Sequence, residues 1–397
     1  MTAPFSVICI SPQDWDVDLP TNRQQIMRRV AARGHQVLFV ESGSFLLRQP
    51  GVLARRPWRL ALLLRTRVAQ PGIAVCKALN VVPWGKKYRV ASRVNFGLTA
   101  RRLRRAARTL PRPVVLWIYD PCAESIIGAC GEAVAVYDCV DDYGEQYGAQ
   151  YGRDERRRRL VADADREAAR RSRLVFTTTT PLDERHRRIN PRTYLVPNVG
   201  DYEHFSPAAD RAIAHPSIAE LPQPVIGFAG NLQTGKVDFD LLASLAEHRP
   251  DWTLVLLGPT RPGAESAVAA LGRLPNVHVL GWRPYKELPR YYAGFDVGLC
   301  PYVWSDAMRS GFPLKLYDYL AVGMPVVASG NPDLAGMEPD VVLVRGADEL
   351  VRAVEAALSL RGEADRDRRR ALAARNTWET RTERLLALTA AELEPPS

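Results

Sequence analysis

The sequence of 397 residues contains no run of about 18 uncharged apolar residues, which is the length a helix needs to cross a lipid bilayer. We therefore expect no membrane-spanning helix. The N-terminal stretch MTAPFSVICISP has no basic segment ahead of an apolar core, so we also expect no signal peptide. Together these two absences predict a cytoplasmic protein.

The six cysteines are scattered along the chain and form no Cys-x-x-Cys pair. Disulfide frameworks and zinc sites both need cysteines at regular, close spacings. The pattern therefore predicts reduced, buried cysteines of a cytosolic protein, with no disulfide framework and no metal site.

Positive charge is in excess, with a formal net charge of +10. It is concentrated in arginine-rich stretches at 48–67, 101–108 and 152–159. These stretches are typical of solvated helix faces, or of a surface that meets an anionic membrane, and the first mixes Leu, Trp and Arg as an interfacial helix does. No nucleic-acid recognition motif accompanies them, so we expect no nucleic-acid partner.

Apolar, β-branched runs alternate with helical segments in both halves of the chain. The run FSVICIS (5–11), the helical stretch 21–34 and the run HQVLFVES (35–42) make one βαβ unit, whose two strands should be parallel. Further strands are predicted at 113–119, 133–139, 173–179, 193–197, 224–230, 252–258, 277–281, 297–302, 324–329 and 341–344. Two successive α/β blocks predict two doubly wound, Rossmann-like domains that face each other across a cleft.

The proposed domain boundaries follow changes in composition. We expect an N-terminal domain over 1–200, a proline-rich linker over 201–224 and a second domain over 225–375. The final helical stretch, 376–397, is expected to cross back to the first domain. Ligands of such sheets bind at the carboxyl ends of the strands.

The stretch GFPLKLYDYLAVGMPVVAS (311–329) places a lysine in the first turn of a predicted helix that starts at Pro313 and stops at Gly323. A cation there is unfavourable by about 0.3–1 kcal/mol because of the helix dipole. A bound anion would reverse that penalty. Lys315 and Asp318 share one helix face, so the lysine can meet a diphosphate while the aspartate accepts hydrogen bonds from two ribose hydroxyls. The alternative is a simple intrahelical ion pair.

Two further strand ends carry candidate donor-binding residues. Gly230 follows a predicted strand and lets a backbone approach a ligand, and Lys236 could reach a phosphate. Gly281, Trp282 and Arg283 follow another strand and could contact a base. A plain strand–helix connection and ordinary packing are the alternatives for these two groups.

The motifs that contain these residues resemble those of a known family. The chain resembles GT-B glycosyltransferases of the family 4 kind, and more narrowly the bacterial group that builds surface polysaccharides and teichuronic-type polymers. The resemblance is carried by DWDVDLPTNRQQIMRRVAARGHQVLFVES, LVPNVGDYEHFSP, FAGNLQTGK and PLKLYDYLAVGMPVV. It implies a metal-independent transferase without cofactor, which binds a nucleotide-sugar on its second domain, UDP-linked by preference, and the acceptor on its first.

Residue by residue, Asp318 matches the position that binds ribose in this family, whereas Ser310 replaces the family's first glutamate. Asn231 and Lys236 stand where the family has an arginine and a lysine, and we expect Arg309 to replace lost charge. The resemblance extends the expected donor site to a list that comprises Gly230, Asn231, Lys236, Gly281, Trp282, Arg283, Arg309, Ser310, Gly311, Pro313, Leu314, Lys315 and Asp318.

Acidic residues at strand ends of the first domain are candidates for the catalytic base of an inverting reaction. They are Asp120, Asp141 and Asp142. A retaining reaction would leave them as acceptor-binding residues, and helix caps or loop turns are the structural alternative. Fold logic places the acceptor against the loop after the first strand, namely Asp14, Trp15, Asn22, Arg23 and Gln24.

The predicted function is transfer of a sugar from a nucleotide-diphosphate sugar to a hydroxyl of a glycan, a lipid-linked acceptor or a small molecule. A GT-B sugar-nucleotide 2-epimerase is one alternative. A catalytically silent nucleotide- or glycan-binding partner protein is the other, because Ser310 and Asn231 depart from the family pattern. We also expect the protein to be peripheral on the inner face of the cell membrane if its basic stretches bind lipid.

Overall fold

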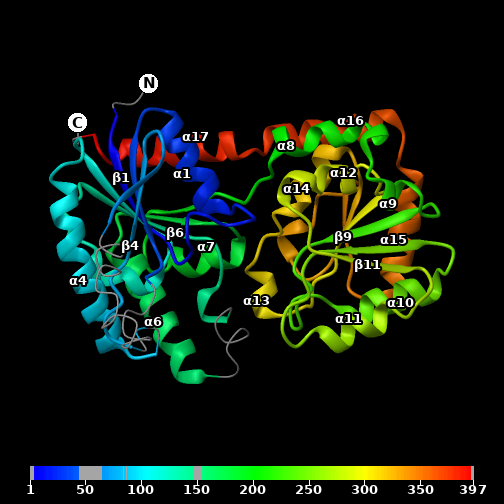
Figure 1. Ribbon diagram of the computed structural model, residues 1–397, viewed down its shortest axis with the longest axis horizontal. Helices are drawn as coiled ribbons and strands as arrows, with labels where there is room; N and C mark the ends of the chain where they lie inside the picture. The colour runs from blue at the N-terminus through cyan, green and yellow to red at the C-terminus, as the bar shows by residue number, and fades with distance from the viewer. Residues whose placement is uncertain (1–3, 44–64, 84, 86, 146–153, 395–397) are drawn as a thin grey trace, which may run out of the picture. The chain divides into compact units, whose positions relative to one another are not determined.

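The computed structural model describes residues 4–43, 65–83, 85, 87–145 and 154–394. The chain forms two compact units (Figure 1). The first comprises Met1–Pro197 with Thr382–Ser397, and the second comprises Asn198–Arg381. Most of the basic stretch 48–67 lies outside the described residues.

The first unit is built on an eight-stranded sheet in the order β3-β4-β2-β1-β5-β6-β7-β8. Every pairing is parallel except that of β3 with β4, which is antiparallel. The central strands are buried along their whole length, as a parallel sheet with helices on both faces requires. The strands are β1 (Ser6–Ile10), β2 (Gln36–Glu41), β3 (Arg67–Gln70), β4 (Ile73–Lys77), β5 (Val114–Ile118), β6 (Val134–Cys139), β7 (Leu174–Thr177) and β8 (Thr193–Leu195).

Helices of the first unit pack against this sheet. They are α1 (Asn22–Ala32), α4 (Arg89–Ala107), the 3-10 helix η2 (Pro121–Ile126), α6 (Glu155–Arg171) and α7 (Thr180–Arg187). The first unit also includes α17 (Trp378–Ala391) from Thr382 onward. Glu392, just after α17, pairs with Arg173 at 2.5 Å, which fastens the end of the chain beside β7.

The second unit contains a six-stranded, all-parallel sheet in the order β11-β10-β9-β12-β13-β14. Its strands are β9 (Val225–Ala229), β10 (Thr253–Leu257), β11 (Val277–Gly281), β12 (Val297–Cys300), β13 (Val326–Ala328) and β14 (Val341–Leu343). The chain builds outward from β9 through β10 to β11 and then returns to the other side of β9 with β12. The switch point between β9 and β12 is where doubly wound sheets bind their ligands, at the carboxyl ends.

The helices of the second unit cover both faces of its sheet. They are α10 (Phe239–His248), α11 (Glu265–Leu271), η5 (Tyr285–Glu287), α12 (Leu288–Tyr292), α13 (Asp306–Arg309), α14 (Lys315–Val322), η6 (Pro332–Leu334), α15 (Ala347–Ser359) and α16 (Glu363–Arg375). Gly323 ends α14 with φ 85°, a left-handed conformation that suits glycine. The expected glycine stop of this helix is therefore present.

The segment 201–224, which the sequence predicts as a linker, belongs to the second unit. It folds into short helices, α8 (Tyr202–Phe205), η3 (Ser206–Ala209), η4 (Arg211–Ile213) and α9 (Pro216–Ala219). Phe205 and Ile218 are fully buried in the core of that unit. Two apolar anchors in a proline-rich sequence are enough to dock the segment, and for this reason the structure differs from the prediction.

Candidate functional site

The start of α14 lies at the carboxyl-end side of the second unit's sheet. The helix begins at Lys315 with Leu314 as its N-cap residue. Pro313 therefore lies before the helix, whereas the sequence predicts it at the first helical position. The Leu316 N–H donates to Pro313 O at 3.2 Å, so the proline closes the turn that leads into the helix.

The Lys315 ammonium is buried among aromatic rings. Its Nζ lies 2.5 Å from the Tyr302 hydroxyl and 4.6 Å from the centre of the Phe228 ring. Burial is the main cause that lowers the pKa of Lys315 to about 8; the charge of Lys236 acts in the same direction, while Cys300 and Asp318 oppose it. Among the residues that the structure describes, Lys315 forms no ion pair. A buried cation without an ion pair is a site at which an anion would be stabilised.

Gly230 makes room for this lysine. It follows β9, and a Cβ atom at this position would lie 2.5 Å from Lys315 Nζ. A Cβ on Gly258, which follows β10, would lie 1.9 Å from Gly230 O. The two strand ends are thus packed backbone to backbone, and the contact of Gly230 with Lys315 was not predicted from the sequence.

Asp318 lies one turn into α14 and is also buried. Its Oδ1 accepts a hydrogen bond from the Asp201 N–H at 3.0 Å. Burial raises the pKa of Asp318 to about 7, and the charge of Asp201 adds to that rise. Among the described residues, the Asp201 N–H is the one hydrogen-bond donor to Asp318. The carboxylate therefore retains capacity to accept hydrogen bonds from a ligand.

Asp201 and its neighbours were not predicted as site residues. The Tyr285 hydroxyl donates to Asp201 Oδ2 at 2.9 Å, and the Tyr285 ring stacks on His204 with 4.3 Å between centroids. These contacts fix the loop before α8 against η5, so the donor to Asp318 is held in place. The signal was available, because Asp201 and His204 belong to the motif LVPNVGDYEHFSP that carries the family resemblance.

Asn231 and Lys236 lie beside the same strand end as Gly230. Asn231 Oδ1 accepts from Arg261 Nε at 2.9 Å, and Lys236 Nζ lies 5.9 Å from the centre of the Tyr302 ring. Lys236 and Lys315 thus flank Tyr302. Arg261, which was not predicted as a site residue, brings a further cation next to Asn231.

The strand end after β11 carries an exposed aromatic side chain. Gly281 has φ 71°, and Trp282 is 49% exposed. The Arg283 Nε donates to the Tyr291 hydroxyl at 2.8 Å, and the Arg283 Nη1 donates to the Trp282 carbonyl oxygen at 2.9 Å. Trp282 is therefore the side chain of the three that remains open to a ligand.

The loop between α13 and α14 is fastened by its carbonyl groups. Gly311 O accepts from Asn331 Nδ2 at 2.7 Å, and Ser310 is buried. Arg309 lies on α13 at 3.9 Å from Asp306 and is about half exposed. Its weak surface pair leaves the Arg309 side chain able to reorient.

The first unit gives two of its three candidate aspartates structural contacts. Asp120 Oδ1 accepts from the Cys122 N–H at 3.0 Å and caps η2. Asp142 pairs with Arg185 at 2.6 Å and accepts from the Glu145 N–H at 3.2 Å. These contacts correspond to the helix-cap and loop-turn alternatives for both residues.

Asp141 lies in a different setting, close to Arg23 and Tyr143. The Arg23 Nη2 donates to the Tyr143 hydroxyl at 2.7 Å, and its guanidinium lies 5.3 Å from the centre of the Tyr119 ring. Burial opposes the charge on Arg23, but Tyr143, Asp141 and Tyr119 together raise its pKa. The structure thus brings the predicted residues Arg23 and Asp141 close to each other.

The other predicted acceptor residues take part in local structure. Trp15 is buried, its N–H donates to Glu41 Oε1 at 2.9 Å, and its ring packs edge-on against Phe39. The Gln24 side chain accepts from the Thr21 N–H, which completes a capping box at the start of α1. The same side chain also donates to Asp14 O at 2.8 Å. Asn22 is buried in the first turn of the same helix.

A buried polar cluster lies just behind the Asp141 loop. Cys139, Asp165 and His186 offer ligand atoms within 4.8 Å of one another, the one such group in the described parts of the chain. His186 Nδ1 must donate to Leu182 O at 2.8 Å, since a carbonyl can only accept, and its Nε2 lies 3.1 Å from Asp165 Oδ2. Burial opposes the charge on His186, but Cys139 and Asp165 raise its pKa to about 11. We interpret the cluster as an imidazolium–carboxylate pair that joins β6, α6 and α7.

The chain has two doubly wound, mainly parallel sheets, one in each unit, and a buried lysine lies at a strand end of the second. Two such units define the GT-B class of fold. Residues 223–360 match the family of glycosyl transferases group 1. The second unit is therefore similar to the group 1 glycosyltransferases over most of its length.

Sequence comparison gives a relative of the same class. The chain is 30% identical over 259 residues to TuaH of Bacillus subtilis (strain 168), whose name assigns it provisionally as a teichuronic acid biosynthesis glycosyltransferase. The match covers 61% of this chain and 63% of TuaH, so it spans less than two thirds of that relative's length.

Solved structures share the fold over the whole chain. Sucrose-phosphate synthase from Thermosynechococcus elongatus superposes with a TM-score of 0.72 at 18% identity, with 98% of each chain covered. Anabaena Alr3699/HepE in complex with UDP gives 0.67 at 13% identity, with 98% of this chain and 100% of that chain covered. The resemblance to GT-B glycosyltransferases that the sequence predicts is confirmed, as is the fold class.

Proposed function

We propose that this protein is a glycosyltransferase that moves a sugar from a UDP-sugar to a hydroxyl of a glycan, a lipid-linked acceptor or a small molecule. The observation that carries the proposal is the buried Lys315 ammonium, which faces Gly230 at the carboxyl end of β9 without an ion pair among the described residues. The neighbour Alr3699/HepE is described in complexes with UDP and with UDP-glucose, which supports UDP as the carrier.

In this proposal the diphosphate of the donor lies against Lys315. Lys236 on one side and Arg261 on the other add positive charge, and the N-terminus of α14 adds its dipole. These cations would stabilise the negative charge that develops on the departing UDP. Because cations of the protein occupy this role, the proposal includes a metal-independent transfer without cofactor.

The ribose of the donor would be held by Asp318. Its carboxylate accepts one hydrogen bond from the Asp201 N–H and can accept others from the two ribose hydroxyls. Trp282, exposed at the end of β11, would contact the base. In this arrangement Lys315 contacts the diphosphate and Asp318 contacts the ribose, and about one helical turn separates the two residues.

The acceptor would bind to the first unit near Arg23 and Asp141. In an inverting reaction Asp141 would take the proton of the acceptor hydroxyl, and in a retaining reaction it would only bind the acceptor. Asp120 and Asp142 would then keep their structural contacts. TuaH, the relative named for teichuronic acid biosynthesis, supports a polysaccharide or lipid-linked acceptor.

Peripheral membrane binding is part of the proposal. No helix among the described residues is both long and apolar enough to span a bilayer. One exposed stripe of α4 carries Val90 and Val94, which are 75% and 43% exposed, and then Arg101, Arg104 and Arg105. Among the described residues, none of these three arginines forms an ion pair. Apolar side chains followed by unpaired cations fit the surface of an anionic membrane.

The proposal is tested with purified protein and a panel of nucleotide sugars. Release of UDP from UDP-sugars, with or without an acceptor, would support a transferase. Binding of UDP without any turnover across the panel would favour the silent binding protein that the changes at Ser310 and Asn231 keep open. Sedimentation with anionic and neutral vesicles tests the membrane part, since Arg104→Glu with Arg105→Glu should abolish binding to anionic vesicles alone.

A further inference from the structure

A cavity of about 590 Å³ lies in the second unit, at the opposite end of the sheet's strands from the proposed donor site. Its lining includes Phe295 and Asp296 just before β12, and Met324 and Pro325 just before β13. The cavity therefore lies at the amino ends of parallel strands, whereas Gly230 lies at a carboxyl end. The length of a five-residue strand such as β9 separates the two ends of the sheet by about 16 Å.

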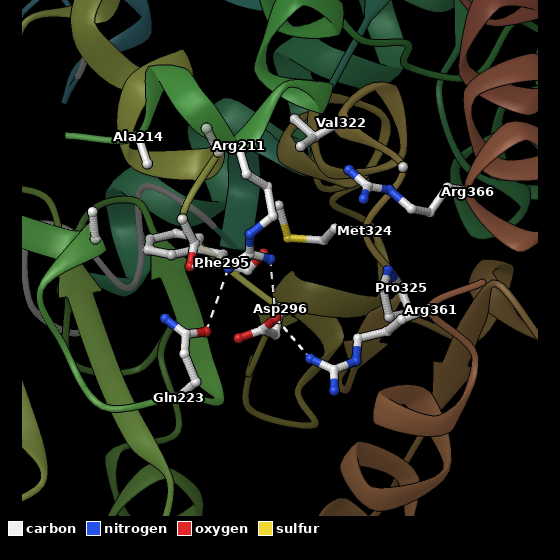
Figure 2. A pocket seen from close by; sticks show the side chains of 14 residues that line it. Arg211, Ala214, Gln223, Phe295, Asp296, Val322, Met324, Pro325, Arg361 and Arg366 are labelled. Atoms are coloured by element: carbon white, nitrogen blue, oxygen red, sulfur yellow. Dashed lines mark hydrogen bonds and ion pairs between the residues drawn. The ribbon is translucent and has the colours of Figure 1, made fainter. Parts of the chain in front are cut away.

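Three arginines reach this cavity from separate elements. Figure 2 shows Arg211 from η4, Arg361 from the connection between α15 and α16, and Arg366 from α16 around its opening. Asp296 is the one carboxylate in the lining. The cavity thus holds a surplus of two positive charges.

Asp296 is already fully occupied. Its Oδ1 accepts from Arg211 at 3.0 Å and from Arg361 at 2.8 Å, and its Oδ2 accepts from the Val225 N–H at 2.8 Å. The carboxylate is 3% exposed, so it is a fixed part of the wall. It orients two of the arginines but can neutralise only one of them.

The arginines differ in how many of their donors are engaged. Arg211 donates to Asp296, to Gln223 and to two backbone carbonyls, so its fork is used. Arg361 uses Nη1 and Nε, and Arg366 uses only Nη2, which donates to Ala209 O at 2.8 Å. Among the described residues, the Arg361 Nη2 and the Arg366 Nη1 and Nε have no partner. These free donors are suited to a tetrahedral oxyanion.

Two further acidic side chains lie near this cavity but outside its lining. A smaller neighbouring cavity of about 310 Å³ shares Arg361 and Arg366 with it and also contains Glu363 and Asp367. Asp367 pairs with Arg370 at 3.5 Å, and among the described residues neither acid pairs with Arg361 or Arg366. The larger cavity itself is thus lined by three arginines and one carboxylate.

The remaining side chains of the lining are apolar or small, except for Gln223. Phe295, Met324 and Pro325 line the cavity together with Val322 and small residues. Phe295, Val322 and Met324 are at most 4% exposed, so they shape the cavity from the core side. The cavity volume of about 590 Å³ lies in the range of small-molecule pockets and leaves room for the organic group of an ester beside its phosphate. A phosphate monoester carries nearly two negative charges at neutral pH, which matches the surplus, while a carboxylate carries one.

We propose that this cavity binds a phosphate monoester, held by Arg361 and Arg366. The ligand is either a free small ester or the monoester headgroup of a lipid, because both present the same dianion. The site is separate from the proposed donor site and does not depend on the glycosyltransferase assignment.

The test is calorimetric titration of the full-length protein with phenyl phosphate, with benzoate as a monoanionic probe of similar size. We expect phenyl phosphate to bind, and benzoate to bind at least tenfold more weakly. The double variant Arg361→Gln/Arg366→Gln should lose at least tenfold in affinity for phenyl phosphate. Arg366→Gln alone should lose affinity too, and this variant leaves both partners of Asp296 in place.

Two control variants separate the cavity from other cationic surfaces. Arg352→Gln removes an exposed arginine of α15 that has no partner among the described residues, and Lys315→Ala alters the donor site. Both should bind phenyl phosphate as the parent does. Retention of parental affinity in Arg366→Gln, loss in Lys315→Ala, or equal binding of benzoate would overturn the proposal.

A vesicle experiment separates the two sources of the ester. The parent and the double variant are sedimented with vesicles of phosphatidylcholine, with or without phosphatidic acid. Binding to phosphatidic acid that the double variant loses supports a lipid headgroup as the ligand. Equal vesicle binding by both proteins, together with arginine-dependent binding of phenyl phosphate, supports a free ester.

Discussion

Lys315 Nζ occupies the space next to Gly230, only 2.5 Å from where a Cβ atom on that residue would lie. The lysine is therefore aimed at the carboxyl end of β9 because the strand ends in a glycine. Gly230→Ala would push the ammonium away from the proposed diphosphate. We expect about a tenfold loss of UDP affinity, which corresponds to about 1.4 kcal/mol.

Calorimetry of UDP binding measures this effect. Gly272→Ala is the matched control, because its Cβ would lie 3.5 Å from the nearest atom, Val268 O, an ordinary contact. Parental affinity in Gly230→Ala would show that the position of Lys315 does not matter for the nucleotide.

The two buried titratable groups of the site predict how UDP affinity depends on pH. Lys315, with a pKa of about 8 in the free protein, loses its charge as the pH rises above 8, so affinity for the diphosphate should fall there. Asp318, with a pKa of about 7, becomes protonated below pH 7 and then accepts ribose hydroxyls less well. We expect the highest affinity between these values, by calorimetry from pH 5.5 to 9.5.

Variants assign each limb of that profile. Lys315→Ala should remove the decline on the alkaline side, and Asp318→Asn should remove the decline on the acidic side. A flat profile in the parent would contradict the role of both groups.

Arg261 brings a positive charge close to the end of β9, where its Nε donates to Asn231 Oδ1 at 2.9 Å. We expect Arg261→Ala to weaken binding of UDP by about tenfold, in line with a charge-assisted hydrogen bond of about 1.5 kcal/mol. Arg273→Ala, an exposed arginine of the same unit, should leave the affinity unchanged. If the two variants behave alike, Arg261 has no specific contact with the nucleotide.

The pair of His186 with Asp165 predicts a stability effect in the first unit. His186→Leu leaves the buried Asp165 carboxylate without its cation, which costs roughly 3–5 kcal/mol in comparable cases. Urea unfolding measures the loss, and Asp165→Asn combined with His186→Gln should recover part of it. A loss well under 1 kcal/mol would show that the pair is not ionic.

The sign of the pH effect follows from the shift. The pKa of His186 is raised from 6.5 to about 11 in the folded protein, so its contribution is complete below pH 6.5, as long as Asp165 stays ionised, and is lost as the pH rises toward 11. The difference in unfolding free energy between the parent and His186→Leu should therefore shrink across that range.

The fold could be predicted largely because its strands are buried on both faces. FSVICIS and HQVLFVES became β1 and β2 within one residue at each end, since unbroken apolar runs have few other stable positions. The hairpin of β3 and β4 was missed because it lies at the sheet edge, where Val68 is 80% exposed and the apolar signal is weak.

The candidate site could be predicted where its chemistry conflicted with local rules. A lysine at a helix start beside an aspartate and a glycine at a strand end are such conflicts, and the structure places Lys315, Asp318 and Gly230 together. Arg261 and Asp201 could not be found this way, because they contact residues 30 and 117 positions distant, which only the fold brings near.

The most direct test of the account compares the binding of UDP and uridine to three proteins: the parent, Lys315→Ala and Asp318→Asn. The account predicts that Lys315→Ala loses at least tenfold in affinity for UDP but none for uridine, whereas Asp318→Asn loses affinity for both. Unchanged uridine binding also shows that the site remains folded. Parental affinity of both variants for UDP would contradict the claim that the start of α14 holds a nucleoside diphosphate.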